Sequence, residues 1–332
     1  MMRTTAILGI SLLLTFIPPL AYSQDTLGSL ESQTQQFDKL VPPQSKIEVL
    51  AKGFTWTEGP VWIGDENGYL LFSDIPRNTI FKWKGQSVST FMSPSGYTGV
   101  TYYGLEPGSN GLFLSRTGEL MMCEHGDRRL SVLTRDGGKR TLVDNYQGKR
   151  LNSPNDGFVK SNGDIYFTDP PYGLPDRFTD RRRELDFCGV YRLSPGGDLT
   201  LLTKSIERPN GIALSPDEKT LYVAQSNPSE ANWTAFQLDA SGNVVGQGRE
   251  LLNVTDRVGK EPGLPDGMTV DAEGNLWASG PGGIYVLTGD GKLLGRIVTG
   301  EKTSNCTFGP GGYLYMTVDS MLCRIKTNAK SQ

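Results

Sequence analysis

The chain has 332 residues, a formal net charge of −3, 41 glycines and 20 prolines. With 36 acidic residues against 33 basic ones, it has no excess of positive charge for a phosphate backbone, which argues against a nucleic-acid partner. Its single histidine, His125, excludes zinc centres that need two or three histidines, and any Ser-His-Asp triad would have to use it.

Residues 1–23 have the pattern of a secretory signal peptide. A cationic start at Arg3 precedes an apolar run and a small-residue site, so we expect cleavage before Gln24. The apolar run is short and is broken by Pro18 and Pro19, which argues against a membrane anchor, and no later segment is apolar enough to span a bilayer. We therefore predict an exported protein, either periplasmic or secreted.

Residues 24–45 form an N-terminal extension that resembles no other part of the chain. The segment is polar and contains proline, so it is expected either to wrap the folded domain or to form a loose tail. The strand-like sequence KIEVLAKG follows at residues 46–53.

A repeated unit of two apolar runs joined by a turn then fills the rest of the chain. Its period of about 40 to 55 residues is typical of a propeller blade. The six copies are residues 57–74, 109–125, 154–170, 209–226, 265–281 and 304–320.

The copies also predict how the ring closes. Each is followed by a third apolar run, and five have a fourth run, which the last copy lacks. The run at residues 46–53 could supply it, and such closure hides the sheet edges of an open array. We therefore predict an all-β fold, a six-bladed β-propeller over residues 46–328 whose last blade is closed by an N-terminal strand.

One connection between blades is longer than the others. It covers Ser93–Gly108 between the first and second copies and is rich in Gly, Tyr and Ser. Its position predicts a loop at the face where the inner strands begin, and it could be either a lid over the channel or a plain insertion.

Each copy opens with a polar residue that should face the central axis. These openers are Glu58, Asn110, Asn155 or Asp156, Asn210, Asp266 and Asn305. Asn-Gly and Asp-Gly pairs are also common turn formers, but turns elsewhere in each copy use other residues.

Four of the openers have the chemistry of a cation site. Glu58, Asn155, Asn210 and Asp266 would bring two carboxylates and two amide oxygens together, and their charge balances one divalent cation. Such hard ligands suit Ca²⁺ best, with Mg²⁺, Mn²⁺ or Zn²⁺ as alternatives.

Further polar residues are expected at the channel mouth. His125 ends the second strand of its copy, as Asp74, Asp169 and Gln225 do in theirs, and a hairpin returns this end to the start of the first strand. Arg150 and Asn152 immediately precede the third opener. We therefore consider Arg150, Asn152, His125 and Asp169 as substrate-binding candidates, although a solvated arginine or a satisfied loop histidine would look the same.

The four cysteines, Cys123, Cys188, Cys306 and Cys323, show no zinc-binding spacing. They could be buried thiols or form one or two disulfides in an oxidising compartment.

Specific motifs resemble the gluconolactonase family, also called the SMP-30 or regucalcin-like family. They are TEGPVW, CEHGDRRL, RLNSPNDG, YFTDPPYG, RPNGIALS and LPDGM, and the resemblance runs from Lys46 to Lys326. It implies a six-bladed propeller whose channel cation is held by Glu58, Asn155, Asn210 and Asp266. The third motif and the long connection resemble bacterial members, which leaves open whether Arg150 or Asn152 takes the role of the family's substrate-contacting arginine.

The resemblance implies hydrolysis of a sugar lactone of the glucono-1,5-lactone type. The cation would polarise the lactone carbonyl, and Asp266 would act as general base or, alternatively, as nucleophile. Two other hypotheses remain: a phosphotriesterase-like hydrolase on the same metal site, and an exported binding propeller with a structural calcium ion. The sequence leaves the preferred lactone and the oligomeric state open.

Overall fold

The structure, a computed structural model, describes residues 25–331. The predicted signal peptide lies outside the described residues. Within them, no helix is long and apolar enough to cross a membrane. The one α-helix of this part, α1 (Gln35–Leu40), has 6 residues.

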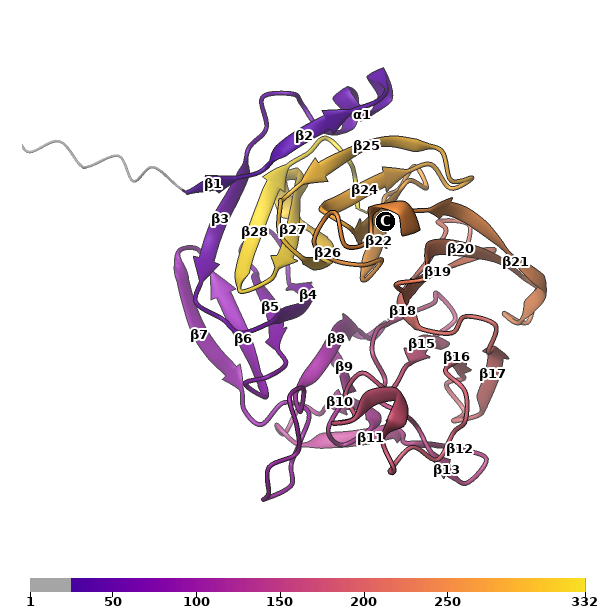
Figure 1. The fold of residues 1–332 in the computed structure, drawn as a ribbon. Coiled ribbons are helices and arrows are strands. Elements are labelled where there is room, and N and C mark those ends of the chain that lie inside the picture. The colour runs from indigo at the N-terminus through magenta and orange to yellow at the C-terminus, as the bar shows by residue number, and fades with distance from the viewer. Residues whose placement is uncertain (1–24, 332) are drawn as a thin grey trace, which may run out of the picture.

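Six antiparallel sheets form a closed ring around a central axis (Figure 1). The first three are β4 (Thr57–Ile63), β5 (Tyr69–Asp74), β6 (Thr79–Lys84) and β7 (Ser87–Met92); β8 (Ser109–Leu114), β9 (Leu120–Glu124), β10 (Arg129–Leu133) and β11 (Lys139–Val143); and β14 (Gly157–Val159), β15 (Ile165–Asp169), β16 (Gly189–Leu193) and β17 (Leu199–Thr203). The fourth is β18 (Pro209–Leu214), β19 (Thr220–Asn227), β20 (Glu230–Leu238) and β21 (Val244–Asn253), and the fifth has β22 (Met268–Val270), β23 (Leu276–Gly280), β24 (Gly283–Leu287) and β25 (Leu293–Val298).

The sixth sheet joins the two ends of the chain. Strands β26 (Thr303–Gly309), β27 (Tyr313–Val318) and β28 (Met321–Lys326) continue into β3 (Ile47–Lys52), which pairs antiparallel with β28. The predicted six-bladed propeller with an N-terminal closing strand is therefore confirmed. Outside the blades lie the hairpin of β12 (Asn145–Tyr146) and β13 (Lys149–Arg150) and the 3-10 turns η1 (Arg177–Thr179) and η2 (Thr255–Arg257). A third such turn, η3 (Pro310–Gly312), joins β26 to β27 within the sixth blade.

Period-two alternation along the strands packs each blade against both of its neighbours. In β5, Leu70 and Phe72 pack toward the sixth blade, whereas Leu71 packs toward the second. Comparable apolar clusters fill all six interfaces between blades of the described chain. The core is therefore a closed belt of interfaces around the channel, and burial of apolar surface holds the ring shut.

The N-terminal extension wraps the outer rim of the fifth and sixth blades (Figure 1). Strand β2 (Ser29–Ser32) pairs with β25 as a fifth strand, and β1 (Thr26–Leu27) pairs with β3. Glu31 reaches the guanidinium of Arg296 at 3.0 Å, and this arginine is only 2% exposed. The extension thus ties the fifth blade to the sixth blade, within which β3 closes the ring.

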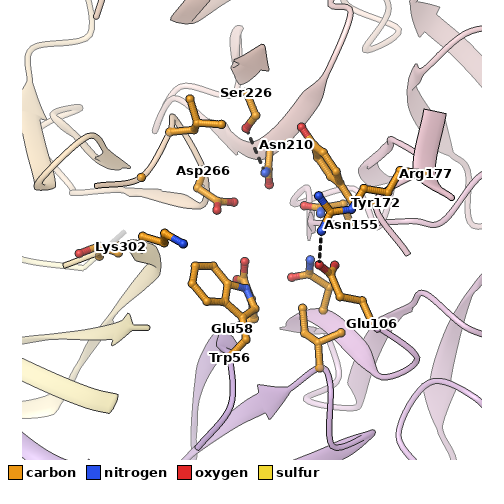
Figure 2. Close-up of a pocket in the computed structure, with 15 residues that line it drawn as sticks. Trp56, Glu58, Glu106, Asn155, Tyr172, Arg177, Asn210, Ser226, Asp266 and Lys302 are labelled. Atoms are coloured by element: carbon orange, nitrogen blue, oxygen red, sulfur yellow. Dashed lines mark hydrogen bonds and ion pairs between the residues drawn. The ribbon is translucent and has the colours of Figure 1, made fainter. Parts of the chain in front are cut away.

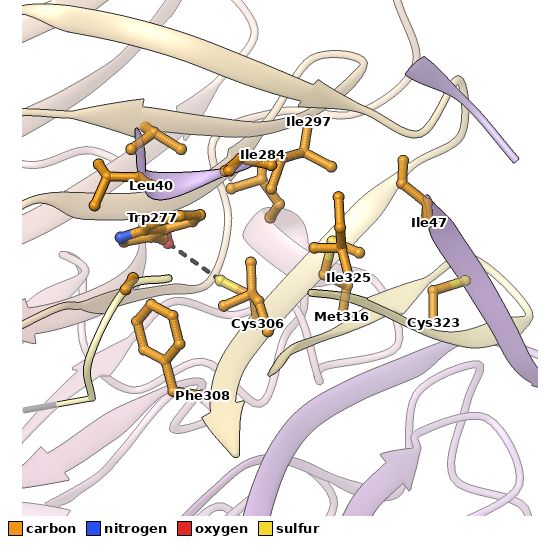
Figure 3. Close-up of a cluster of buried hydrophobic side chains, with 14 of the residues drawn as sticks. Leu40, Ile47, Trp277, Ile284, Ile297, Cys306, Phe308, Met316, Cys323 and Ile325 are labelled. Carbon is orange, nitrogen blue, oxygen red and sulfur yellow. Dashed lines mark hydrogen bonds between the residues drawn. The ribbon is translucent and has the colours of Figure 1, made fainter. Parts of the chain in front are cut away.

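Helix α1 adds apolar packing to the N-terminal extension, which we call the strap. Thr34 caps its N-terminus by accepting a hydrogen bond from the Phe37 backbone N–H. Phe37 and Leu40 are buried in the cluster between the fifth and sixth blades, part of which appears in Figure 3. In the same cluster, the Cys306 thiol lies 3.1 Å from the carbonyl oxygen of Trp277. All four cysteines are buried free thiols, so no disulfide contributes to the fold.

We predict that Phe37→Ala lowers the free energy of unfolding by about 3 kcal/mol, because it leaves a cavity where a fully buried ring had packed. Denaturant titration followed by tryptophan fluorescence measures this change. Val245→Ala, on the exposed edge strand β21, should change the stability by less than about 0.5 kcal/mol. Equal stabilities of the two variants would show that the strap does not stabilise the ring.

Candidate metal centre and active site

The innermost strands bring the predicted ligands to one end of the channel. Glu58 and Asn210 are the second residues of β4 and β18, and Asn155 and Asp266 lie two residues before β14 and β22. Their side chains come from four different blades and line one cavity of about 440 Å³. In Figure 2, Glu58, Asn210 and Asp266 point toward one another across this cavity.

Close approach of neighbouring blades explains why glycine follows Glu58, Asn210 and Asp266. A Cβ atom on Gly211 would lie 2.2 Å from the carbonyl oxygen of Asp266, and one on Gly59 would lie 2.2 Å from that of Asn110. The glycines therefore let each blade pack against the opener of the next one. This packing requirement, in addition to turn propensity, accounts for the repeated Asn-Gly and Asp-Gly pairs.

Two of the four side chains have a defined orientation. The Asn210 amide nitrogen donates to Ser226 Oγ at 3.1 Å, and Ser226 itself donates to the carbonyl oxygen of Pro265. Glu58 Oε2 accepts a hydrogen bond from the Gly59 backbone N–H at 3.0 Å. Since its nitrogen is used by Ser226, Asn210 is left with its amide oxygen free to act as a ligand.

The two carboxyl groups resist ionisation in the absence of a cation. Burial, and next the charge of Asp156, raise the pKa of Glu58 to about 8. Burial and the charge of Glu58 raise the pKa of Asp266 well above its ordinary value. Asp156, beside Asn155, has its pKa raised to about 7 by burial. Like charges gathered in a low-dielectric site repel each other, and a divalent cation would relieve that repulsion.

The donor set fits a hard divalent cation. No group of three or more His, Cys, Asp or Glu side chains within residues 25–331 is arranged to hold a metal ion. A cation here would therefore be held by Glu58 and Asp266 together with the amide oxygens of Asn155 and Asn210. Such all-oxygen ligation is typical of Ca²⁺ and disfavours metals that prefer sulfur or imidazole.

The four substrate-binding candidates do not line this cavity. Asn152, His125 and Asp169 are fully buried, and Arg150 lies on the surface, where its guanidinium donates to the Asp127 carbonyl oxygen at 2.8 Å. Asp169 accepts hydrogen bonds from the backbone N–H groups of Asn152 and Ser153, both at 2.8 Å.

For Asp169, the physical reason is a recurring backbone contact at the end of the second strand. Asp74 accepts from the N–H groups of Thr55 and Trp56, just as Asp169 does in its blade, and Gln225 accepts from that of Arg208. These side chains accept hydrogen bonds from the backbone N–H groups of the segment that leads into the innermost strand. Asp169 and Asn152 are therefore engaged by neighbouring backbone groups rather than by the cavity.

Other cavity residues were missed because they lie outside the phase of the repeat. Glu106 comes from the Ser93–Gly108 connection, and Arg177 and Tyr172 come from the loop after β15. Arg177 and Glu106 form an ion pair at 3.0 Å. Trp56 and Lys302 complete the rim, with Lys302 opposite Arg177 (Figure 2). Only Trp56 had a sequence signal, since it precedes Glu58 by two residues and lies immediately before β4.

Together the fold and site define a class: a closed six-bladed propeller with oxygen donors at one end of its channel. Comparisons with known proteins agree. Residues 56–320 match the family model described as "SMP-30/Gluconolactonase/LRE-like region". The gluconolactonase of Zymomonas mobilis is 41% identical over 317 residues, covering 91% of this chain and 87% of the relative.

Solved structures give the same result. A gluconolactonase from Xanthomonas campestris is 31% identical and superposes with a TM-score of 0.78, covering 93% of this chain and 99% of its own. A calcium-binding regucalcin from Agrobacterium tumefaciens shares the fold, with a TM-score of 0.66, 19% identity and coverage of 86% and 94%. The chain belongs to the SMP-30/gluconolactonase/LRE-like family.

For the metal-free protein, we predict that the free energy of unfolding falls as pH rises from 5 to 8. Folded Glu58, with a pKa of about 8 against 4.5 for an ordinary glutamate, holds a proton in this range that the unfolded chain releases. Its contribution is complete at low pH and is lost as pH rises through the folded pKa. Glu58→Gln should reduce the slope.

Chemical denaturation at several pH values, in the presence of a chelator, measures this slope. Glu66→Gln, on an exposed turn, is the matched control and should leave the slope unchanged. Identical slopes for Glu58→Gln and the native protein would contradict the proton assignment.

Proposed function

We propose that the chain is an exported, metal-dependent hydrolase that opens sugar lactones of the glucono-1,5-lactone type to aldonic acids. The similarity to the Zymomonas mobilis gluconolactonase over most of both chains supports the reaction class. The observation that carries the proposal is the convergence of Glu58, Asn155, Asn210 and Asp266 on one cavity. The signal-peptide pattern of residues 1–23 supports export.

When bound at these four residues, a divalent cation, Ca²⁺ in the first instance, supplies a Lewis acid that polarises the lactone carbonyl. Glu58, Asn155 and Asn210 are assigned as ligands. Burial first, and then the charge of Glu58, raise the pKa of Asp266, and a cation bound between the two carboxyl groups would lower it. Asp266 is then a carboxylate that can take a proton from the attacking water as general base, in addition to its role as a ligand.

The remaining wall of the cavity suits a polyol. The Trp56 indole offers a flat apolar face to the C–H groups of a sugar ring, while Lys302, Arg177 and Tyr172 carry hydrogen-bond donors at the rim. This mixture of one aromatic face with several polar groups favours a hydroxylated lactone over an apolar phosphotriester.

The decisive assay measures the opening of glucono-1,5-lactone with and without a chelator, in the native protein, Glu58→Gln and Asp266→Asn. Chelation should abolish turnover, and added Ca²⁺ should restore it. Glu58→Gln should lose metal affinity. Asp266→Asn should retain measurable metal binding and lose about 100-fold or more in kcat, the usual cost of removing a general base.

Asp271→Asn is the matched control, because Asp271 is a buried carboxylate that follows the opposite end of the same strand, β22. It should leave the rate unchanged. Hydrolysis of an organophosphate is measured in parallel. Unchanged lactone turnover after chelation would contradict the metal role. A metal-bound protein that opens no lactone in a broad panel would favour a binding propeller, and hydrolysis of the organophosphate alone would favour a phosphotriesterase.

A further inference from the structure

Four side chains form a continuous chain beside the cavity. Arg177 pairs with Glu106 Oε1 at 3.0 Å, and Glu106 Oε2 lies 3.7 Å from Nδ1 of His125. On the other side of the imidazole, Nε2 of His125 lies 3.3 Å from the amide nitrogen of Asn110. Arg177, Glu106 and Asn110 line the cavity, whereas His125, the single histidine of the chain, lies behind its wall.

The surroundings of His125 determine which of its nitrogens carries the proton. Burial lowers the pKa of His125 to about 3, so the ring is neutral and has one N–H group. Nδ1 forms no hydrogen bond to any described residue, but it lies 3.7 Å from the Glu106 carboxyl group. Burial raises the pKa of Glu106, whereas its ion pair with Arg177 lowers that pKa and favours the charged form. A carboxylate opposite Nδ1 favours the tautomer with the proton on Nδ1, which leaves Nε2 as an acceptor.

This tautomer orients the amide of Asn110. An acceptor at Nε2 takes a hydrogen bond from the Asn110 amide nitrogen, so the amide oxygen is turned away from the histidine. Because Asn110 lines the cavity, that oxygen becomes available to a bound molecule. The arrangement parallels Asn210, whose nitrogen is held by Ser226.

The imidazole is also held rigidly in place. A Cβ atom on Gly173 would lie 2.4 Å from Cβ and Cγ of His125, so the loop after β15 packs directly against the ring. Tyr103 donates a hydrogen bond to the His125 carbonyl oxygen at 3.4 Å. A ring packed in this way can act on the cavity only through Asn110 and Glu106.

We propose that Asn110 is a substrate-binding residue whose amide oxygen accepts a hydrogen bond from a ring hydroxyl of the sugar lactone, and that His125, oriented by Glu106, is its positioning residue. The inference rests on the proposed lactonase function for the identity of the ligand. It assigns no proton transfer to His125 and adds Asn110 to the groups that recognise substrate.

A double-mutant cycle tests the coupling between the two residues. Asn110→Ala should raise KM for glucono-1,5-lactone about tenfold, the value of one lost hydrogen bond, with a smaller change in kcat. His125→Phe keeps a ring but removes the acceptor, and it should raise KM to a similar extent. If His125 acts through Asn110, the double variant should resemble Asn110→Ala alone.

Restoring the affinity with a second substitution at His125 distinguishes positioning of Asn110 from a general effect on stability. His125→Gln places a polar group near the position of Nε2 and should restore most of the affinity, whereas His125→Asn, which reaches only the position of Nδ1, should not. Asn275→Ala removes a buried amide from the turn before β23 and should lower stability without raising KM. Melting temperature and calcium binding, measured for every variant, identify any that fails to fold.

Binding of D-glucitol to the calcium-loaded protein provides a readout that needs no reaction, and it should weaken in parallel with the rise in KM. Multiplicative effects of the two substitutions on KM, or an unchanged KM in Asn110→Ala, would overturn the inference and leave the lactonase proposal standing. A native protein that neither opens a lactone nor binds the polyol would overturn both.

Discussion

Two buried carboxyl groups, Glu58 and Asp266, brought together at one end of the channel are the constraint on which this site depends. The charges that raise the pKa of Asp266 belong to three other acids, Glu58, Asp156 and Glu106. An enclosed group of acids is unfavourable unless protons or a cation neutralise it. Under the proposed function, the same arrangement that costs stability in the metal-free protein provides affinity for a divalent ion, and it makes the Asp266 carboxylate available as the general base.

The ring makes this arrangement possible because it fixes residues that are distant in sequence. Glu58 and Asp266 lie on different blades, and their separation depends on closure by β3 and on apolar packing at every interface between blades. The N-terminal extension joins the fifth blade to the sixth, which contains the closing strand, through β2, Phe37 and the Glu31–Arg296 ion pair. Packing at the outer rim therefore helps to fix the distance between the carboxyl groups at the central axis.

Most of the fold could be predicted from the sequence, because the blade period and the missing last strand are both local patterns. The strap could be predicted only in outline, since β1 and β2 have 2 and 4 residues, too few for a periodic signal. The candidate ligands share one phase of the repeat and converge as expected. Glu106 and Arg177 could not be predicted, because they lie in irregular loops outside the blade repeat. The structural role of Asp169 could not be predicted either, because it depends on hydrogen bonds to backbone groups.

Besides the buried carboxyl groups, the site depends on the orientation of its asparagine amides. Ser226 and His125 each accept a hydrogen bond from the amide nitrogen of a cavity asparagine, Asn210 and Asn110 respectively. In our proposals, the amide oxygen that this leaves free binds the cation at Asn210 and a sugar hydroxyl at Asn110. The central claim remains the shared ion. Anomalous diffraction from a crystal soaked in MnCl₂ tests it most directly: the account predicts one peak within about 2.5 Å of oxygens from Glu58, Asn155, Asn210 and Asp266. A channel without a peak, or a metal bound elsewhere while Glu58 and Asp266 stay unliganded, would contradict it.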